Sequence, residues 1–438
     1  VDTSTDVRHC GGCGRECEAP INARQICNDG MCAFECEPGY ARVLGMCVET
    51  DAPRPIHPLS TARVSSRRPT LRWQLAPRSD GAVVEVCEDR ACTSIVDTID
   101  AEGNSARPPR DLPAGVVFWR LRSRTGGVAG ASLSATWQMD VPHGSRRTEA
   151  EQAWTGSLDF DGDGVADFVV GAPLRDAGRA YLYRGGIGGL DEPSRIDPPA
   201  STEGYFGAAA ANGGDINGDG FADILMGAPD PFGDRDGAAY LFLGGSEAAT
   251  ASATTLRPPV GTRGQFGAAV ASAGDVDGDG YADVLIGAPR SRSDDGAVYL
   301  YRGGEGGLSL SPQVLEGPIG LRSAFGQALA SIGDIDGDGY GDVLVGAVAA
   351  VHLYRGGPAG LTLNRTMTSP VDAFGRSLAV GDVDADGLVD VAVGAPDEGS
   401  SAGAVYLFRG VAGGLEPTPR RIAGLAGGAL GTSVRMGD

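Results

Sequence analysis

Lysine is absent from this chain of 438 residues, whose 36 basic side chains are all arginine. Enzymes that need a lysine, such as phosphate-loop NTPases, protein kinases and Schiff-base enzymes, are therefore excluded. Aromatic residues make up only 6% of the chain, and it has no uncharged apolar run long enough to cross a membrane. The 4 histidines are scattered and form no HExxH pattern, so we expect no enzymatic activity.

Acidic residues are in excess, and the formal net charge is −21. Residues 1–150 are nearly neutral, with 18 Arg against 19 Asp plus Glu, whereas residues 151–438 hold 18 Arg against 38 acidic residues. A field of this sign repels nucleic acid and anionic membrane surfaces, so neither is an expected partner. The feature that requires acidic residues must lie in the last two thirds of the chain.

Cysteine is concentrated near the amino terminus. Seven of the nine cysteines precede residue 48: Cys10, Cys13, Cys17, Cys27, Cys32, Cys36 and Cys47. This density is typical of a disulfide scaffold in an oxidising, extracellular compartment. A zinc site that uses the Cys10/Cys13 and Cys27/Cys32 pairs is the alternative. Because seven cysteines cannot all pair and Cys10 lies near the first residue, we expect a fragment whose missing amino-terminal region holds a partner and provides anchoring.

Two different segments precede the acidic region. Residues 1–52, with the texts HCGGCGREC and CNDGMC, resemble EGF-like or stigma-specific-like cysteine modules. In residues 53–145, Leu71, Trp73 and Leu75 alternate with polar residues, as half-buried strands require. This segment is similar to fibronectin type III or immunoglobulin-like β-sandwiches. We expect Cys87 and Cys92 to form a bridge across a hairpin.

From residue 146 onward the sequence repeats itself. Anchor aspartates at 159, 215, 275, 334 and 382 are separated by 56, 60, 59 and 48 residues, the length of a four-stranded blade. Residues 146–438 are therefore predicted to form a β-propeller of five repeats, and Leu430 begins a text like the start of a sixth. The predicted fold class is all-β, with the propeller preceded by a sandwich and a small disulfide-rich module.

Each repeat contains the pattern D-x-[DN]-x-D-G-x-x-D. Its members are Asp159, Asp161, Asp163 and Asp167; Asp215, Asn217, Asp219 and Asp223; Asp275, Asp277, Asp279 and Asp283; Asp334, Asp336, Asp338 and Asp342; and Asp382, Asp384, Asp386 and Asp390. Carboxylates ~4 Å apart repel by roughly 4 kcal/mol at an effective dielectric near 20, so a cation is expected among them. Hard oxygen donors without His or Cys favour Ca²⁺ over Zn²⁺, and a flexible loop suits Ca²⁺ better than Mg²⁺.

The predicted calcium ligands are the side chains at loop positions 1, 3, 5 and 9 and the carbonyl at position 7, which gives about five sites. The position-7 residues are Val165, Phe221, Tyr281, Tyr340 and Leu388. An EF-hand is excluded because position 12 lacks its glutamate and an apolar strand follows the loop. A solvated acidic turn without metal is the other alternative.

These repeats resemble FG-GAP repeats like those of the integrin alpha-subunit propeller. The FG element occurs at Phe206, Phe266, Phe325 and Phe374, each followed by glycine, and the GAP element begins at Gly171, Gly227, Gly287 and Gly394. The first copy departs, with Trp154 to Gly156 in place of FG, and the fourth reads GAV. Because an integrin propeller has seven blades, we expect either a ring that continues beyond this chain, which we favour, or a last strand that completes the first blade.

The resemblance implies a secreted or cell-surface, calcium-dependent adhesion or binding protein. Its ligand, a protein or a glycan, would dock on the loops opposite the metal loops, with the two amino-terminal modules as spacers. Two alternatives remain: a lectin-like propeller using Trp154, Tyr205, Phe232 or Tyr240, or a non-catalytic accessory region of a secreted hydrolase. The arginine-only composition with abundant Ala and Gly suggests a GC-rich bacterial genome, and hence display on a bacterial outer surface.

Overall fold

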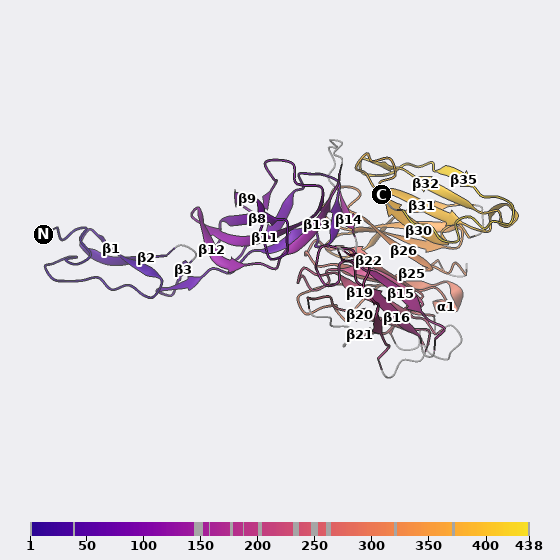
Figure 1. Cartoon of the computed structure of the whole chain (residues 1–438), viewed down its shortest axis with the longest axis horizontal. Helices are drawn as coiled ribbons and strands as arrows, with labels where there is room; N and C mark the ends of the chain where they lie inside the picture. Colours follow the sequence, from indigo (N-terminus) through magenta and orange to yellow (C-terminus); the bar gives the residue numbers. More distant parts are fainter. Residues whose placement is uncertain are drawn as a thin grey trace. The chain divides into compact units, whose positions relative to one another are not determined.

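In the computed structural model the regular secondary structure is almost entirely β-strand, with two one-turn helices among the described residues, α1 (Ser291–Asp294) and α2 (Glu398–Ser401) (Figure 1). The described residues are 2–37, 40–143, 152–156, 158–175, 178–186, 188–199, 204–230, 236–246, 253–259, 264–318, 322–369 and 373–436. Within these ranges, neither helix has the length or apolarity that a bilayer crossing needs. The predicted all-β class is confirmed.

The chain forms two compact units. The first contains Val1–His57, Thr70–Pro109 and Phe118–Thr136, and the second contains Pro58–Pro69, Arg110–Val117 and Trp137–Asp438.

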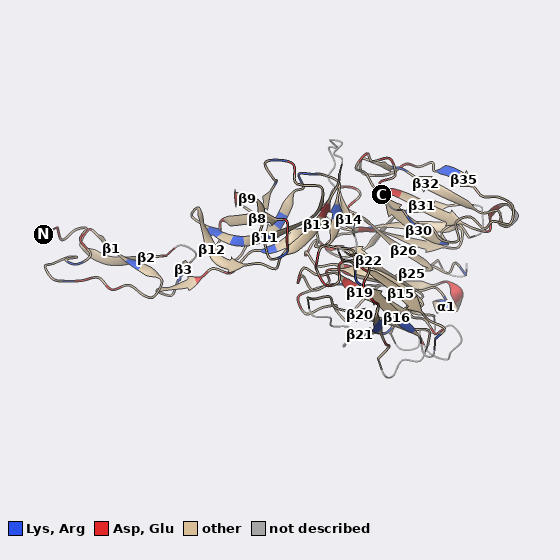
Figure 2. Cartoon of the chain, viewed as in Figure 1, with Lys and Arg blue, Asp and Glu red and all other residues tan. Residues whose placement is uncertain are grey.

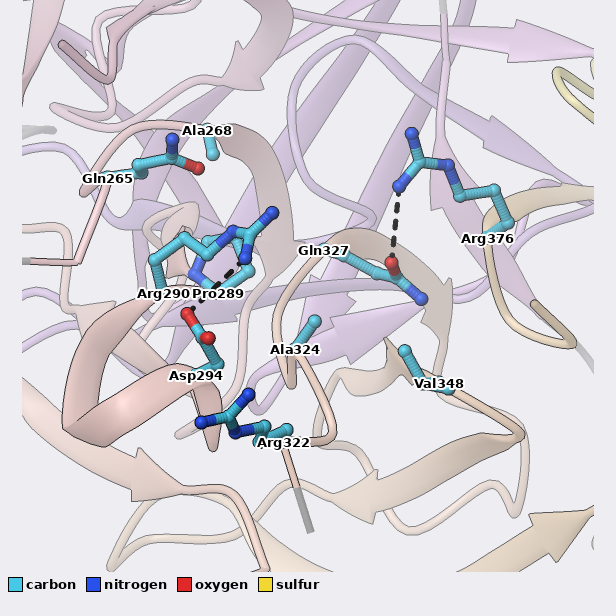
Figure 3. A pocket seen from close by; sticks show the side chains of 10 residues that line it. All are labelled: Gln265, Ala268, Pro289, Arg290, Asp294, Arg322, Ala324, Gln327, Val348 and Arg376. Carbon is cyan, nitrogen blue, oxygen red and sulfur yellow. Dashed lines mark hydrogen bonds and ion pairs between the residues drawn. The ribbon is translucent and has the colours of Figure 1, made fainter. Parts of the chain in front are cut away.

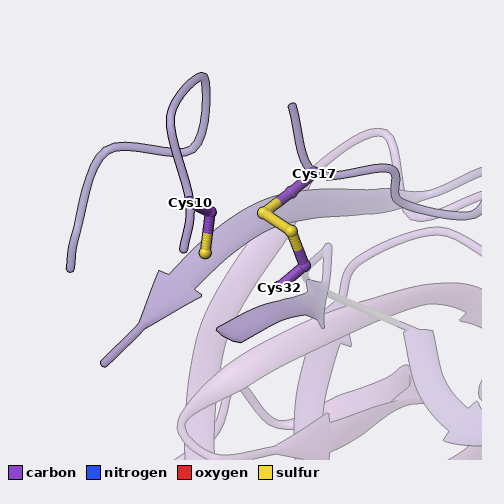
Figure 4. A group of neighbouring side chains, drawn as sticks. All are labelled: Cys10, Cys17 and Cys32. Carbon is purple, nitrogen blue, oxygen red and sulfur yellow. A yellow bond between two sulfur atoms is a disulfide. The ribbon is translucent and has the colours of Figure 1, made fainter. Parts of the chain in front are cut away.

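Disulfides hold the amino-terminal part of the first unit. Its strands are two hairpins, β1 (Ala23–Asn28) with β2 (Met31–Cys36) and β3 (Tyr40–Val43) with β4 (Met46–Glu49). The bridges are Cys10–Cys27, Cys17–Cys32 and Cys36–Cys47. Figure 4 shows the bridge between Cys17 and Cys32, with Cys10 beside it. The disulfide prediction is confirmed, and the bridged sulfurs are not available as zinc ligands. The odd cysteine is the exposed Cys13 rather than Cys10, which is buried and bridged.

The rest of the first unit has two sheets. In one, β8 (Gly81–Cys87) pairs with β9 (Ile95–Glu102) and β11 (Gly115–Thr125), and β11 also pairs with β12 (Val128–Leu133). In the other, β7 (Leu71–Gln74) lies between β5 (Arg54–His57) and β10 (Ser105–Ala106). Leu71 and Trp73 are completely buried, as the sequence alternation predicts, whereas Leu75 lies beyond the end of β7 and is exposed. The expected Cys87–Cys92 bridge closes the connection from β8 to β9.

The second unit contains five antiparallel sheets in chain order, the blades of a propeller-type fold. Blade 1 is β15 (Phe168–Ala172), β16 (Arg179–Tyr183) and β17 (Ser194–Ile196); blade 2 is β18 (Ala209–Gly214), β19 (Asp223–Ala228), β20 (Ala238–Phe242) and β21 (Thr254–Leu256); blade 3 is β22 (Ala269–Gly274), β23 (Asp283–Ala288), β24 (Ala297–Tyr301) and β25 (Gln313–Glu316); blade 4 is β26 (Ala328–Gly333), β27 (Asp342–Ala347), β28 (Ala350–Arg355) and β29 (Thr362–Thr368); and blade 5 is β30 (Ser377–Gly381), β31 (Asp390–Ala395), β32 (Ala404–Phe408) and β35 (Arg420–Ala423). A small hairpin of β33 (Gly410–Val411) and β34 (Gly414–Leu415) precedes β35. We number the strands of blade 1 second to fourth, to match the other blades.

Apolar side chains fill the space between neighbouring blades. Clusters of buried residues join Leu182 of blade 1 to Ile224 of blade 2, and Leu241 of blade 2 to Ile286 of blade 3. Similar clusters link blades 3 and 4 and blades 4 and 5. The second strands of blades 2 to 5 are buried along their whole length, which accounts for their continuous apolar sequence.

The FG and GAP elements meet where two blades approach most closely. The Phe266 ring packs edge-to-face on Tyr299 of its own blade, with ring centres 5.2 Å apart, and the Gly267 amide donates to the Gly287 carbonyl (3.0 Å). A Cβ on Gly287 would lie 2.1 Å from the carbonyl oxygen of Gly326 in the next blade. Each GAP glycine has such a neighbour, because every blade stacks its backbone on the FG turn of the following repeat.

The segment after blade 5 places Leu430 and Gly431 where the FG pair of a further repeat would lie. Leu430 forms a parallel bridge with Gly403, as Phe325 does with Gly296, and a Cβ on Gly394 would lie 2.1 Å from the Gly431 carbonyl oxygen. In the described part of the chain, β15 pairs with no strand other than β16, so the last segment does not complete the first blade.

Blade 1 differs from the other blades on its inner side. The strand that holds Trp154, β14 (Ala153–Thr155), pairs with β6 (Ala62–Val64), which pairs in parallel with β13 (Trp137–Val141). β14 therefore does not join β15 as a first strand. Trp154 packs instead against the apolar cluster between blades 4 and 5.

Substitution of Gly287 by alanine tests the contact between blades. We expect Gly287→Ala to lower stability by about 1–3 kcal/mol, because the new methyl group has no room beside the next blade. Gly306→Ala in the same blade is the control, since a Cβ there has no neighbour within 4 Å. Urea unfolding measures both variants, and equal midpoints would contradict this account of the GAP glycine.

Candidate metal-binding loops

The five aspartate-rich loops lie at the same end of their blades. In blades 2 to 5 each loop joins the first strand to the second, and its ninth residue begins the second strand. The strands themselves are largely uncharged (Figure 2), so the acidic residues of this unit gather in its connections.

The ninth-position aspartate fastens each loop to the end of the third strand. In blade 3, Asp283 Oδ2 accepts a hydrogen bond from the Val276 amide (2.9 Å) and Oδ1 from the Gly303 amide (2.8 Å). The same two bonds recur in every blade, through Asp167, Asp223, Asp342 and Asp390. All five of these residues are at most 4% exposed. This carboxylate is a buried structural anchor as well as a candidate ligand.

The first-position aspartate shapes the turn. Asp275 Oδ2 accepts the amide of Gly280 (2.8 Å), and Oδ1 accepts the amides of Gly278 and Asp279. The bond to the sixth-position amide is present in all five loops. Gly280 has φ +86°, a left-handed conformation that favours glycine at this position.

The fifth-position carboxylate accepts the amide of the seventh residue in each loop, as Asp279 does from Tyr281 (3.0 Å). The residues expected to offer their carbonyls to a cation are thus held in the turn through their amides.

Four of the loops bring three carboxylates together, with oxygens within 4.8 Å of one another. The groups are Asp159, Asp161 and Asp167; Asp275, Asp277 and Asp279; Asp334, Asp336 and Asp342; and Asp382, Asp384 and Asp390. Asp163, Asp283, Asp338 and Asp386 lie outside these groups, although the sequence pattern included them. Among the described residues the second loop has no such group, and its third position is Asn217.

Burial makes these carboxylates costly to ionise. It raises the pKa of Asp215 to about 8, with a further contribution from Asp219, and the pKa of Asp275 to about 7. It raises the pKa of Asp167 and of Asp342 to about 6.

Several of these oxygens remain unpaired. Asp215 is 1% exposed, and its Oδ1 is buried and accepts no hydrogen bond from the described residues. The Oδ1 atoms of Asp161, Asp277 and Asp384 are also buried and accept no hydrogen bond from the described residues. Buried anionic oxygens of this kind fit a hard divalent cation, which would supply the missing partner.

Hydrogen bonds link the loops of successive blades. The amide of the eighth residue donates to the carbonyl of the first residue in the preceding loop, as from Ala282 to Asp215 (2.9 Å). Between blades 4 and 5 the pattern changes, because the buried Gln152 lies between the loops. Its Oε1 accepts the Val389 amide (2.9 Å), and its Nε2 donates to the Ile335 carbonyl (3.4 Å).

Sequence reasoning missed an arginine at the end of the third strand, which forms an ion pair with the third-position aspartate in four blades. The signal was an aromatic residue followed by Arg-Gly, which reads Tyr-Arg-Gly-Gly in blades 1, 3 and 4 and Phe-Arg-Gly-Val in blade 5. Reasoning from sequence also missed the anchoring bonds of the ninth position, because they join residues about 20 positions apart, as in Asp283 and Gly303.

A Gly-x-Ser-x-Gly pattern at residues 399–403 overlaps α2, in the connection between β31 and β32. The nucleophile elbow of hydrolases joins a strand to a long helix in an α/β sheet. This connection lies within an antiparallel blade instead, so the pattern provides no catalytic geometry.

The opposite end of blades 3 to 5 carries a cavity of about 720 Å³ (Figure 3). Connections between second and third strands contribute Arg290, Asp294 and Val348, and the turns before first strands contribute residues that include Arg322 and Arg376. Arg290 pairs with Asp294 (3.4 Å), and Arg376 donates to Gln327 (3.4 Å). With three guanidinium groups and one carboxylate, the lining is positive in an otherwise strongly acidic unit.

Comparisons with known proteins agree with the repeat structure. The FG-GAP repeat family matches residues 266–301 and 374–408, and the FG-GAP-like repeat family matches residues 159–226. Similar proteins include integrin alpha-5 of Xenopus laevis, 34% identical over 48% of this chain and 22% of the relative. Integrin alpha-V of Gallus gallus is 35% identical over 48% of this chain and 22% of the relative. Integrin alpha-IIb of Homo sapiens is 38% identical over 46% of this chain and 20% of the relative. The chain spans about a fifth of the length of these relatives, and it contains an integrin-like FG-GAP domain.

The raised carboxylate pKa values predict a pH dependence when divalent cations are chelated. Between about pH 5 and 8 these carboxylates hold more protons in the folded chain than in the unfolded chain, so their contribution to stability falls as pH rises. We expect the melting temperature in chelator to increase as the pH is lowered from about 8, and Asp215→Asn to flatten the upper part of this profile. Thermal melts across this pH range measure the dependence. A melting temperature that rises with pH in chelator would contradict the raised pKa values of the loop carboxylates.

Proposed function

We propose that this chain is an extracellular, calcium-dependent binding protein that uses its FG-GAP blades as a rigid docking platform. The observation that carries the proposal is the repeated loop architecture, in which four of the five loops hold a buried carboxylate oxygen that accepts no hydrogen bond from the described residues. The integrin-like repeats support a role in adhesion or binding, and the disulfides support an oxidising compartment. The role is non-enzymatic.

In this proposal the side chains at positions 1, 3, 5 and 9 and the carbonyl at position 7 of each loop hold one Ca²⁺. Calcium would remove the repulsion between these carboxylates and restrict the loop. Because the first four loops are hydrogen-bonded in series and Gln152 bridges the fourth to the fifth, ordering one loop supports its neighbour. The cation is structural, and it keeps the blades in register for docking at the other end.

Removal of calcium tests the metal part of the proposal. We expect a chelator to lower the melting temperature by more than about 5 °C and calcium to restore it, since a ligand that binds only the folded state stabilises it. Magnesium should restore it poorly, because it demands a strict octahedral shell. Differential scanning calorimetry with each ion measures the effect, and an identical melt with and without chelator would exclude structural calcium.

We assign ligand docking to the cavity bordered by Arg290, Arg322 and Arg376. Antiparallel strands place the connections that line it at the end opposite the calcium loops. Guanidinium groups bind carboxylates with directional, charge-assisted hydrogen bonds. The expected occupant is therefore an aspartate- or glutamate-bearing segment of a protein partner, which the net negative charge of the surrounding surface would otherwise repel.

Charge reversal in the cavity tests the docking assignment. A fluorescent peptide of alternating Glu and Ser is the probe, and a polygalacturonate oligosaccharide provides the glycan arm. We expect Arg322→Glu with Arg376→Glu to weaken peptide binding by at least about tenfold, through the loss of two charge-assisted contacts. Arg195→Glu, at an exposed pair with Asp197, should leave binding unchanged. Binding of the oligosaccharide alone would favour a lectin.

The roles of the other parts of the chain follow from their order along the sequence. We propose that residues 1–52, 53–145 and 146–438 act as a cysteine-rich spacer, a fibronectin- or immunoglobulin-like spacer and the binding propeller. Of the aromatic residues considered for a lectin cleft, Tyr240 is buried and packs on Phe206, whereas Phe232 lies outside the described residues. Trp154 and Tyr205 are half-buried, so the burial of Tyr240 removes one of the four residues considered for a glycan cleft.

A further inference from the structure

An arginine follows or ends the third strand in four of the five blades. Each guanidinium contacts Oδ2 of the third-position aspartate in its own loop. The pairs are Arg184 with Asp161 (3.2 Å), Arg302 with Asp277 (2.9 Å), Arg355 with Asp336 (3.3 Å) and Arg409 with Asp384 (3.0 Å). These four arginines are called the loop arginines below.

Blade 2 departs from the pattern at both positions together. Its third-position residue is Asn217, and Leu243 stands where the loop arginine would be. The Asn217 side-chain amide donates to Asp219 Oδ2 (2.8 Å), so the asparagine is held within its own loop. The loss of the carboxylate and the loss of its partner coincide in one repeat.

The paired change keeps the charge of the loops equal. Counted as formal charges, four aspartates and one arginine give −3 in blades 1, 3, 4 and 5. Three aspartates and no arginine give the same −3 in blade 2. An ion pair needed only to fasten the third strand would not explain this, because the ninth-position aspartate already fastens that strand in all five blades, including blade 2.

The third-position carboxylate also has one oxygen that could still coordinate a cation. In Asp161, Asp277 and Asp384, Oδ2 faces the arginine, whereas Oδ1 is buried and accepts no hydrogen bond from the described residues. The same three residues belong to the carboxylate groups of their loops. One oxygen is thus engaged by a permanent cation of the chain, and the other is available to a bound one.

We propose that the loop arginines are built-in counter-charges that orient the third-position carboxylate and hold each loop at the same net charge. This inference rests on the calcium sites proposed above. The arginine partly neutralises the loop when no ion is bound and limits the affinity when one is bound. Blade 2 reaches the same balance through Asn217 and Leu243, so its site belongs to the same affinity class as the other four.

A double-mutant cycle in blade 3 tests the proposal in the full chain. Arg302→Leu leaves a loop of −4, so we expect a lower melting temperature in chelator and one calcium ion bound roughly tenfold more tightly. Asp277→Asn leaves −2 and should weaken one ion by a similar factor. Arg302→Leu with Asp277→Asn copies blade 2 and should return both quantities to within about twofold of the wild type.

Native mass spectrometry at stepped free calcium counts the ions taken up, and calorimetry in chelator gives the metal-free stability. Arg292→Leu is the matched control, because it removes an arginine paired with Glu316 from the connection between β23 and β24, at the opposite end of the same blade. We expect that control to leave the calcium steps unchanged.

The outcomes separate this inference from the proposed function. If the wild type takes up calcium but Arg302→Leu shifts no step, or the double variant fails to recover, the counter-charge role is wrong and the calcium sites stand. If the wild type takes up no calcium, both proposals fail. A shift with Arg292→Leu equal to that with Arg302→Leu would attribute the effect to overall charge and overturn the inference.

Discussion

Burial of negative charge is the constraint on which this molecule depends. Each blade places a buried carboxylate at the start of its second strand or, in blade 1, directly before it, and both oxygens of that group accept backbone amides from the loop and from the end of the third strand. The carboxylate thereby closes a connection that would otherwise leave amides unsatisfied. Its ionised form is costly away from water, so the surrounding loop must supply positive partners. The amides, the arginines and the proposed cation share that task at one end of the blades.

The other end of each blade is governed by steric contact rather than charge. Apolar side chains fill the space between sheets, and pairs of glycines let the backbones of neighbouring blades approach more closely than any Cβ allows. The FG phenylalanine adds an edge-to-face ring contact inside its own blade. Two independent devices therefore fix each blade, one at each end. The connections around the arginine-lined cavity are carried on this rigid frame, as binding loops commonly are.

Much of this architecture could be predicted because the sequence contains internal repeats that can be aligned with one another. Five copies of one motif revealed the blades, the loops and the glycine at the sixth position, and departures such as Asn217 stood out against four regular copies. The exceptions involve contacts between residues far apart in the sequence. Pairing of β14 with β6, insertion of Gln152 between two loops and the identity of the odd cysteine, Cys13, all depend on tertiary arrangement. The loop arginines lay in a visible repeat, but only the folded strand order shows which carboxylate they meet.

Gln152 has a consequence for how the blades behave as a series. Blades 1 to 4 are linked by direct backbone bonds from loop to loop, whereas one side chain from a distant segment mediates the next junction. A row of similar units with nearest-neighbour contacts behaves as a one-dimensional array, in which opening spreads until it reaches a weaker link. The junction at Gln152 depends on a residue that lies outside the repeats, whereas the three junctions before it are made by the repeats alone. The register of the fifth blade against the fourth is therefore tied to the segment that precedes the first blade.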